Sequence, residues 1–99
     1  MDFADDPEFR SLIREFAQQF PARRDALRAA LEQDDFRTVA DAAHKLAGCA
    51  SAYGFDELGQ RARQCEQAIV GGGDAPTCRR QGEALVAALD AAEASSRAA

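Results

Sequence analysis

Apolar side chains recur at intervals of about three or four residues along almost the whole chain, which is the spacing of an amphipathic α-helix. No stretch shows the convincing alternation of a half-buried β-strand. Only short breaks, at 33–35, 54–55 and 71–74, separate the helical stretches. Long amphipathic helices joined by short loops pack as antiparallel neighbours. The pattern therefore predicts an all-α fold, an antiparallel up-down four-helix bundle without internal repeats.

Capping residues and prolines set the expected ends of the first helical stretch. Asp6 followed by Pro7 favours a helix start, because the aspartate caps free N–H groups and proline has none to lose. The stretch extends to Gln33, and Pro21 predicts that it is either kinked or split near that position. Its predicted core face consists of Phe9, Leu12, Ile13, Phe16, Phe20, Leu27, Ala30 and Leu31.

Three further helices follow. The second covers about 36–53, with Asp34 or Asp35 as its cap and Gly54 as its stop. The third covers about 56–70, and the last begins just after the triple glycine. The inward-facing residues expected in these helices are Phe36, Val39, Ala43, Leu46, Ala50, Tyr53, Leu58, Ala62, Cys65, Ile69, Cys78, Leu85, Val86 and Leu89.

The length of the chain limits its organisation. Its 99 residues suit one domain with a single modest core, which we expect to span 1–99 with 1–5 and about 94–99 frayed. The sequence contains no run of 18 apolar residues, and acidic residues among the first twenty are incompatible with a signal peptide. The initial methionine favours a free-standing protein. We therefore expect a soluble, cytoplasmic monomer.

Charge and cysteine usage exclude several classes of function. The formal net charge of −5 argues against nucleic acid or an anionic membrane as a partner, since both bind basic surfaces. The three cysteines, Cys49, Cys65 and Cys78, lack metal-site spacing, so we interpret them as packing residues. With a single histidine, no metal site is predicted. The triple glycine at 71–73 lacks the lysine and hydroxyl residue of a phosphate-binding loop.

His44 is the only histidine of the chain and lies in an alanine-rich helical stretch. At about 100° per residue, it lies roughly 120° from the middle of the core stripe of that helix. The imidazole is therefore expected on the surface. The docking face expected for a partner is the exposed side of this helix with flanking parts of the preceding and following helices. The residues named for it besides His44 are Arg37, Ala40, Asp41, Lys45, Ala47, Gly48 and Ser51.

Gly48 follows His44 by one helical turn on the same surface. A glycine inside a helix costs about 1 kcal/mol relative to alanine, so its presence needs a reason. Helical side chains lean toward the N-terminus, and a large residue at position 48 would cover the ring. We interpret Gly48 as the residue that keeps the imidazole accessible.

The hairpin of the second and third helices predicts a partner for His44. In an antiparallel pair, residues at the same height have numbers that add up to about 110, which pairs His44 with Glu66 and Ser51 with Gly59. The Glu66 carboxylate would accept a hydrogen bond from one ring nitrogen and leave the other free, as a nucleophilic imidazole requires. The alternative is an ion pair of Glu66 with Arg63.

The segment AAHKLAGCASAYGFDELGQRARQCEQAI, residues 42–69, resembles the histidine-containing phosphotransfer (HPt) domain of bacterial and fungal phosphorelays. The resemblance implies a four-helix bundle whose exposed histidine receives a phosphoryl group from one receiver-domain aspartate and passes it to another. For this sequence it implies that His44 is the phosphoacceptor, that Gly48 gives access and that Glu66 orients the ring. The matching residues are Ala43, His44, Leu46, Gly48, Gly54, Phe55, Leu58, Cys65 and Glu66.

The same resemblance implies the partners of the chain. These would be receiver domains of response regulators or of hybrid histidine kinases. The Mg²⁺ ion and the lysine that stabilise the transferring group would belong to the receiver, so no cofactor is expected on this chain. It would be a phosphotransfer intermediate without kinase activity or a nucleotide site.

The sequence departs from the family pattern at two positions. A lysine common three residues after the histidine, where it can contact the phosphoryl group, is replaced by Ala47, and a serine after the glycine is replaced by Cys49. Lys45, about 100° round the helix from His44, and Arg37, two turns earlier, are the remaining candidates for contact with the phosphate.

Two other functions stay open at the level of the sequence. A degenerate bundle that acts only as an interaction module would leave His44 unused. An enzyme, such as a phosphohistidine phosphatase or a kinase fragment, would need acid, base and nucleotide-binding groups that the sequence does not show.

Overall fold

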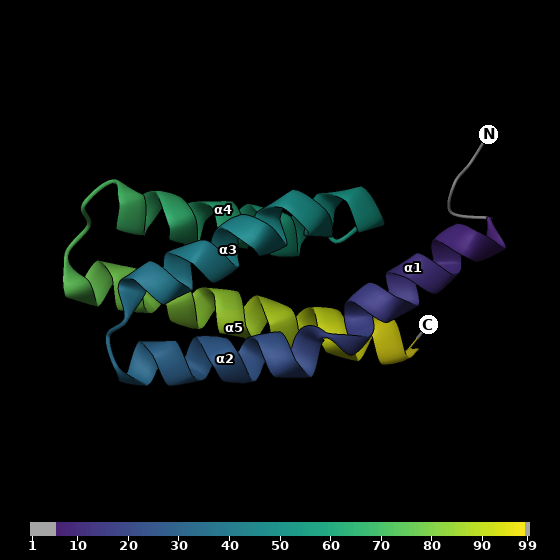
Figure 1. Cartoon of the computed structure of the whole chain (residues 1–99), viewed down its shortest axis with the longest axis horizontal. Coiled ribbons are helices and arrows are strands. Elements are labelled where there is room, and N and C mark those ends of the chain that lie inside the picture. Colours follow the sequence, from purple (N-terminus) through teal and green to yellow (C-terminus); the bar gives the residue numbers. More distant parts are fainter. Residues whose placement is uncertain (1–5, 99) are drawn as a thin grey trace.

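The computed structural model describes residues 6–98, and within that range the chain is helical without a strand. The elements are α1 (Pro7–Gln18), α2 (Phe20–Glu32), α3 (Phe36–Ala50), the 3₁₀ turn η2 (Ser51–Tyr53), α4 (Asp56–Val70) and α5 (Ala75–Ala98). Helices α2 to α5 lie side by side along the long axis, and each packs on the next, with α5 returning to α2 (Figure 1). The predicted all-α four-helix bundle is confirmed.

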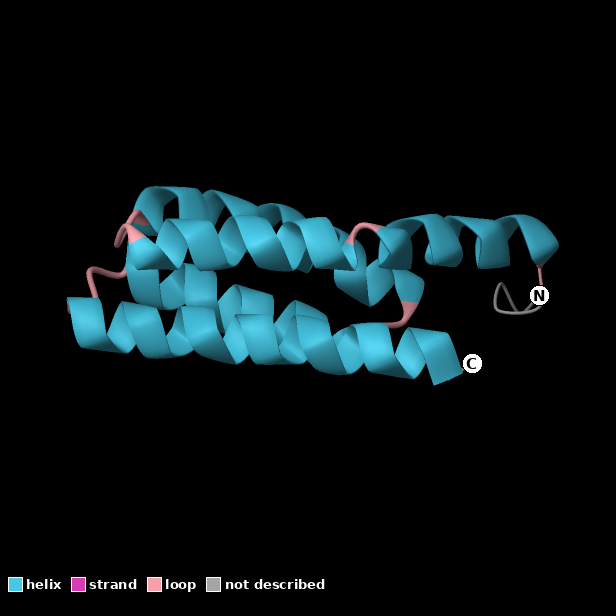
Figure 2. Cartoon of the chain, turned by 90° about the horizontal axis from the view of Figure 1, so that it is seen from below, coloured by secondary structure: helices cyan, strands magenta, loops and turns pink. Residues whose placement is uncertain are grey.

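The first helical stretch is divided at Gln19, close to the predicted Pro21. Pro21 has no N–H to donate to the carbonyl of Ala17, so a continuous helix would lose a hydrogen bond there. In the structure Pro21 stands instead in the first turn of α2, where the N–H is not needed. Most of α1 therefore continues beyond the end of α2 (Figures 1 and 2), whereas its last turn still packs on the bundle through the buried Phe16.

Aspartates begin α1 and α3 as the sequence predicts. The Asp6 carboxylate accepts a hydrogen bond from the N–H of Glu8 at 2.9 Å. Of the two aspartates before α3, Asp35 is the cap, and it accepts bonds from the N–H of Thr38 at 3.3 Å and from its hydroxyl at 2.6 Å. Asp34 lies in the turn before the cap and has a positive φ of 50°, which aspartate tolerates better than most residues.

The hairpin between α3 and α4 is tight. Helix α3 ends at Ala50, three residues before the predicted end, because its last turn narrows to the 3₁₀ turn η2. Gly54 then reverses the chain with a φ of 88°, a left-handed conformation that favours glycine. Helices α3 and α4 approach closely, since a Cβ atom built on Gly59 would lie 2.6 Å from Oγ of Ser51. The predicted pairing of those two positions is therefore present.

The core follows the predicted stripes with one exception, Leu12. Most of the predicted core residues are buried or half-buried, and Phe20, Val39, Leu85 and Leu89 are fully inaccessible. Leu12 was expected in the core but is 46% exposed, because α1 lies beyond the bundle and offers that side chain few neighbours. Helix α5 extends to Ala98, and fraying of about 94–99 stays a prediction; residues 1–5, also expected to be frayed, lie outside the described range.

Candidate functional site

His44 projects from the middle of α3 into solvent. Its side chain is 74% exposed, and its Nδ1 atom lies 2.7 Å from Oε2 of Glu66 on α4. The Glu66 side chain is only 28% exposed, so the flank of the bundle holds the carboxylate in place. Glu66 makes this contact rather than the alternative ion pair with Arg63, as the antiparallel register predicts.

Small side chains explain why a carboxylate reaches the ring. Ala43 on α3 and Ala62 on α4 are fully buried, and the contact at Gly59 allows the two helix backbones to come close. His44 and Glu66 each follow a buried residue, Ala43 and Cys65 respectively, so both lie at the edge of their own core stripe. The two edges face one another across the α3–α4 contact.

Gly48 is exposed, and a Cβ atom built there would meet no heavy atom within 4 Å. No packing contact within the described residues therefore requires a glycine at this position. This leaves open space one turn after His44, as the access argument requires. The neighbouring Ala47 is half-buried and Ser51 is exposed at the start of η2.

The structure corrects one member of the expected docking face. Ala40 was expected on the exposed side of the helix, but it is buried at 9% exposure. Its methyl group lies on the edge of α3 that packs on α4, and the close approach of the helices covers so short a side chain. The other charged candidates on α3, Arg37, Asp41 and Lys45, are exposed.

A groove between α2 and α3 lies beside the histidine. It encloses about 520 Å³ and includes Asp41 and Lys45, which flank His44 along α3. Lys45 therefore faces α2, on the opposite side of α3 from Glu66. The lining residues are Gln19, Ala22, Arg23, Ala26, Leu27, Thr38, Asp41, Ala42, Lys45 and Leu46. Sequence reasoning expected a flanking part of the preceding helix but named no residue of it, although alanines four residues apart at 22 and 26 indicate a smooth helix face.

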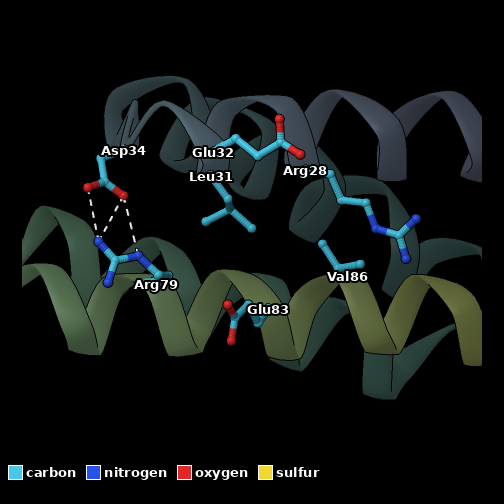
Figure 3. A pocket seen from close by; sticks show the side chains of 7 residues that line it. All are labelled: Arg28, Leu31, Glu32, Asp34, Arg79, Glu83 and Val86. Atoms are coloured by element: carbon cyan, nitrogen blue, oxygen red, sulfur yellow. Dashed lines mark hydrogen bonds and ion pairs between the residues drawn. The ribbon is translucent and has the colours of Figure 1, made fainter.

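A second hollow, of about 550 Å³, lies between α2 and α5 (Figure 3). The ion pair of Arg79 with Asp34, at 2.9 Å, joins α5 to the turn after α2 at one end of it. None of its lining residues comes from α3 or α4, so it does not include His44.

The cysteines are arranged as packing residues. Cys65 and Cys78 are buried, and Cys49 is half-buried. Burial raises the pKa of the Cys65 thiol to about 11, and the nearby Cys78 adds to the effect. A thiol with such a pKa is a poor nucleophile near neutral pH. Within residues 6–98, no group of histidine, cysteine or acidic side chains is placed to hold a metal ion.

Fold and site together define a helical-bundle protein that presents one carboxylate-supported histidine to solvent. A sequence model of the Hpt domain family matches residues 11–95, and the chain therefore belongs to this family. Hpt domains carry phosphoryl groups in two-component signalling, interact with receiver domains and are not kinases. No match was found among curated proteins or among solved structures. No helix in the described part of the chain is long and apolar enough to cross a membrane.

Proposed function

We propose that His44 accepts a phosphoryl group from the aspartate of one receiver domain and passes it to the aspartate of another. The observation that supports this proposal is the combination of a 74% exposed imidazole with the 2.7 Å contact between its Nδ1 atom and Glu66. If the Nδ1–H group donates to the carboxylate, the lone pair of the ring is on Nε2 and points away from α4. The nucleophilic atom is then the accessible one.

The transfer step needs little from this chain beyond position and charge. The Nε2 lone pair attacks the phosphorus atom, an N–P bond forms, and the P–O bond breaks so that the aspartate leaves as a carboxylate. The ring gains a positive charge, which the Glu66 carboxylate beside Nδ1 stabilises. The reverse exchange on a second receiver aspartate regenerates the neutral ring. The Mg²⁺ ion used in this chemistry belongs to the receiver domain.

The groove between α2 and α3 is the docking site that we assign to the receiver. Its centre is apolar, with Ala26 and Leu27 from one wall and Ala42 from the other, and its rim carries Arg23 and Lys45. An apolar centre with a polar rim is typical of transient protein interfaces. A partner seated there also covers the surface around His44, because Asp41 and Lys45 of the α3 wall flank the histidine on the same helix.

The test is phosphoryl transfer from a receiver domain labelled with ³²P. Wild type is expected to become labelled, and His44→Gln is expected to remain unlabelled because it has no imidazole nitrogen. Equal labelling of the two proteins contradicts the proposal. The docking site is tested with Ala26→Arg, which should slow transfer, against Ala29→Arg, an exposed position of α2 that does not line the groove. Equal rates for both arginine variants contradict the docking assignment.

A further inference from the structure

Phosphorylation of His44 adds negative charge that the contact with Glu66 does not neutralise. A phosphoryl group adds a charge of about −1.5 to −2 at neutral pH. The acidic side chains nearest in the helix register are Glu66, beside the ring, and Asp41, one turn earlier on α3. Glu66 stabilises the positive ring, but it repels the phosphoryl oxygens. A cation on this chain would offset that repulsion.

Two basic residues of α3 are poorly placed for this role. Lys45 lines the groove with α2, on the side of the helix away from Glu66. Arg37 lies seven residues before His44, which corresponds to about 10 Å along the helix axis.

Arg63 on α4 is better placed. It precedes Glu66 by three residues, so it lies one turn away on the same flank of the helix. The register that joins His44 to Glu66 and Ser51 to Gly59 places Arg63 level with Ala47, next to the open surface at Gly48. The α3 residues at this height, Ala47 and Gly48, have small side chains that leave the path from α4 to the imidazole open.

Arg63 is also free to bind a phosphoryl group. It is exposed, and its side chain has no hydrogen bond or ion pair with any residue between 6 and 98. This differs from Arg24 and Arg79, which are held in ion pairs with carboxylates.

We propose that Arg63 binds the phosphoryl oxygens of phosphorylated His44. Its planar guanidinium can donate two parallel N–H groups to two phosphate oxygens. Helix α4 then supplies both charges that the modified histidine needs: the carboxylate of Glu66 for the ring and the guanidinium of Arg63 for the phosphoryl group. This inference rests on the proposed function of His44.

The experiment measures how a ³²P label divides at equilibrium between a receiver domain and this chain, at low and at high salt. Arg63→Gln is compared with wild type, with Arg63→Lys and with Arg61→Gln. Arg61 is the matched control, because it is an exposed arginine on the same helix, points away from the α3 flank and contacts Gln64 instead.

Arg63→Gln is expected to shift the equilibrium about tenfold toward the receiver at low salt, the order expected for one exposed cation beside a doubly charged group. The shift should shrink at high salt, where exposed charges are screened. Arg63→Lys should retain part of the effect, and Arg61→Gln should divide the label as wild type does.

An unchanged division in Arg63→Gln, or an equal shift in Arg61→Gln, overturns the role of Arg63. If His44→Gln remains unlabelled in the same series, the proposed function stands and only this inference fails. Equal labelling of His44→Gln and wild type overturns the proposed function and this role together. Circular dichroism of each variant shows that the bundle is folded.

Discussion

Replacing Gly48 by alanine is expected to stabilise the protein. A Cβ atom at this position meets nothing within 4 Å, and the residue lies inside α3, so the change removes the helix penalty of glycine without a clash. That penalty is about 1 kcal/mol in the free energy of unfolding. For a domain of this size, 1 kcal/mol raises the Tm by about 4–8 °C.

Replacing the same glycine by arginine is expected to separate folding from function. Arginine is a good helix former, so Gly48→Arg should be at least as stable as wild type. Its long side chain leans toward the N-terminus of α3 and lies over the imidazole of His44. Phosphoryl transfer should slow by about a hundredfold or more, since small displacements of reacting groups already have effects of that order.

The assay combines urea and thermal unfolding, followed by circular dichroism, with the labelling experiment. Gly59→Ala is the structural control, because its Cβ would lie 2.6 Å from Oγ of Ser51 and the gain in helix propensity is offset by this clash. A loss of stability in Gly48→Ala would show that the glycine is needed for folding. A folded Gly48→Arg protein that transfers at the wild-type rate would refute the access argument.

Three further predictions concern single side chains. Glu66→Ala should slow transfer while the bundle stays folded, because the ring loses its Nδ1 partner; an unchanged rate would exclude an orienting role. Iodoacetamide at pH 8 should alkylate Cys49 but not Cys65, whose thiolate fraction is about one in a thousand at a pKa of about 11. Mass spectrometry of the peptides measures the order, and alkylation of Cys65 before Cys49 would contradict this prediction. Hydrogen bonds from Thr38 lower the pKa of the Asp35 carboxyl, so this cap stabilises the fold at neutral pH and its contribution is lost as the pH falls through the folded-state pKa. Asp35→Ala should therefore lower the free energy of unfolding, relative to wild type, more at pH 7 than at pH 3, as measured by urea unfolding.

Local signals predicted the helices and the central contact of the site. Helix α4 has the predicted bounds, because an acidic first turn and a run of glycines mark its two ends. The contact of His44 with Glu66 follows from the position of the turn at Gly54, since the turn fixes the register of an antiparallel pair.

Features that depend on the distance between helices were not predicted. The angle of Ala40 around α3 placed it on the exposed side beside His44, and only the close approach of α4 decides that so short a side chain is buried. Leu12 has the spacing of a core residue, but the break at Gln19 directs α1 beyond the bundle. The α2 wall of the groove belongs to another helix, so no pattern within α3 identifies the α2 residues that line it.

The most direct test of the account is to locate the phosphoryl group on the chain after incubation with a phosphorylated receiver. Peptide mapping at neutral to alkaline pH, which preserves a phosphoramidate bond, is expected to find the group on His44 and to show its loss when a second, unphosphorylated receiver is added. A phosphoryl group on any other residue, or one on His44 that no receiver removes, would contradict the account.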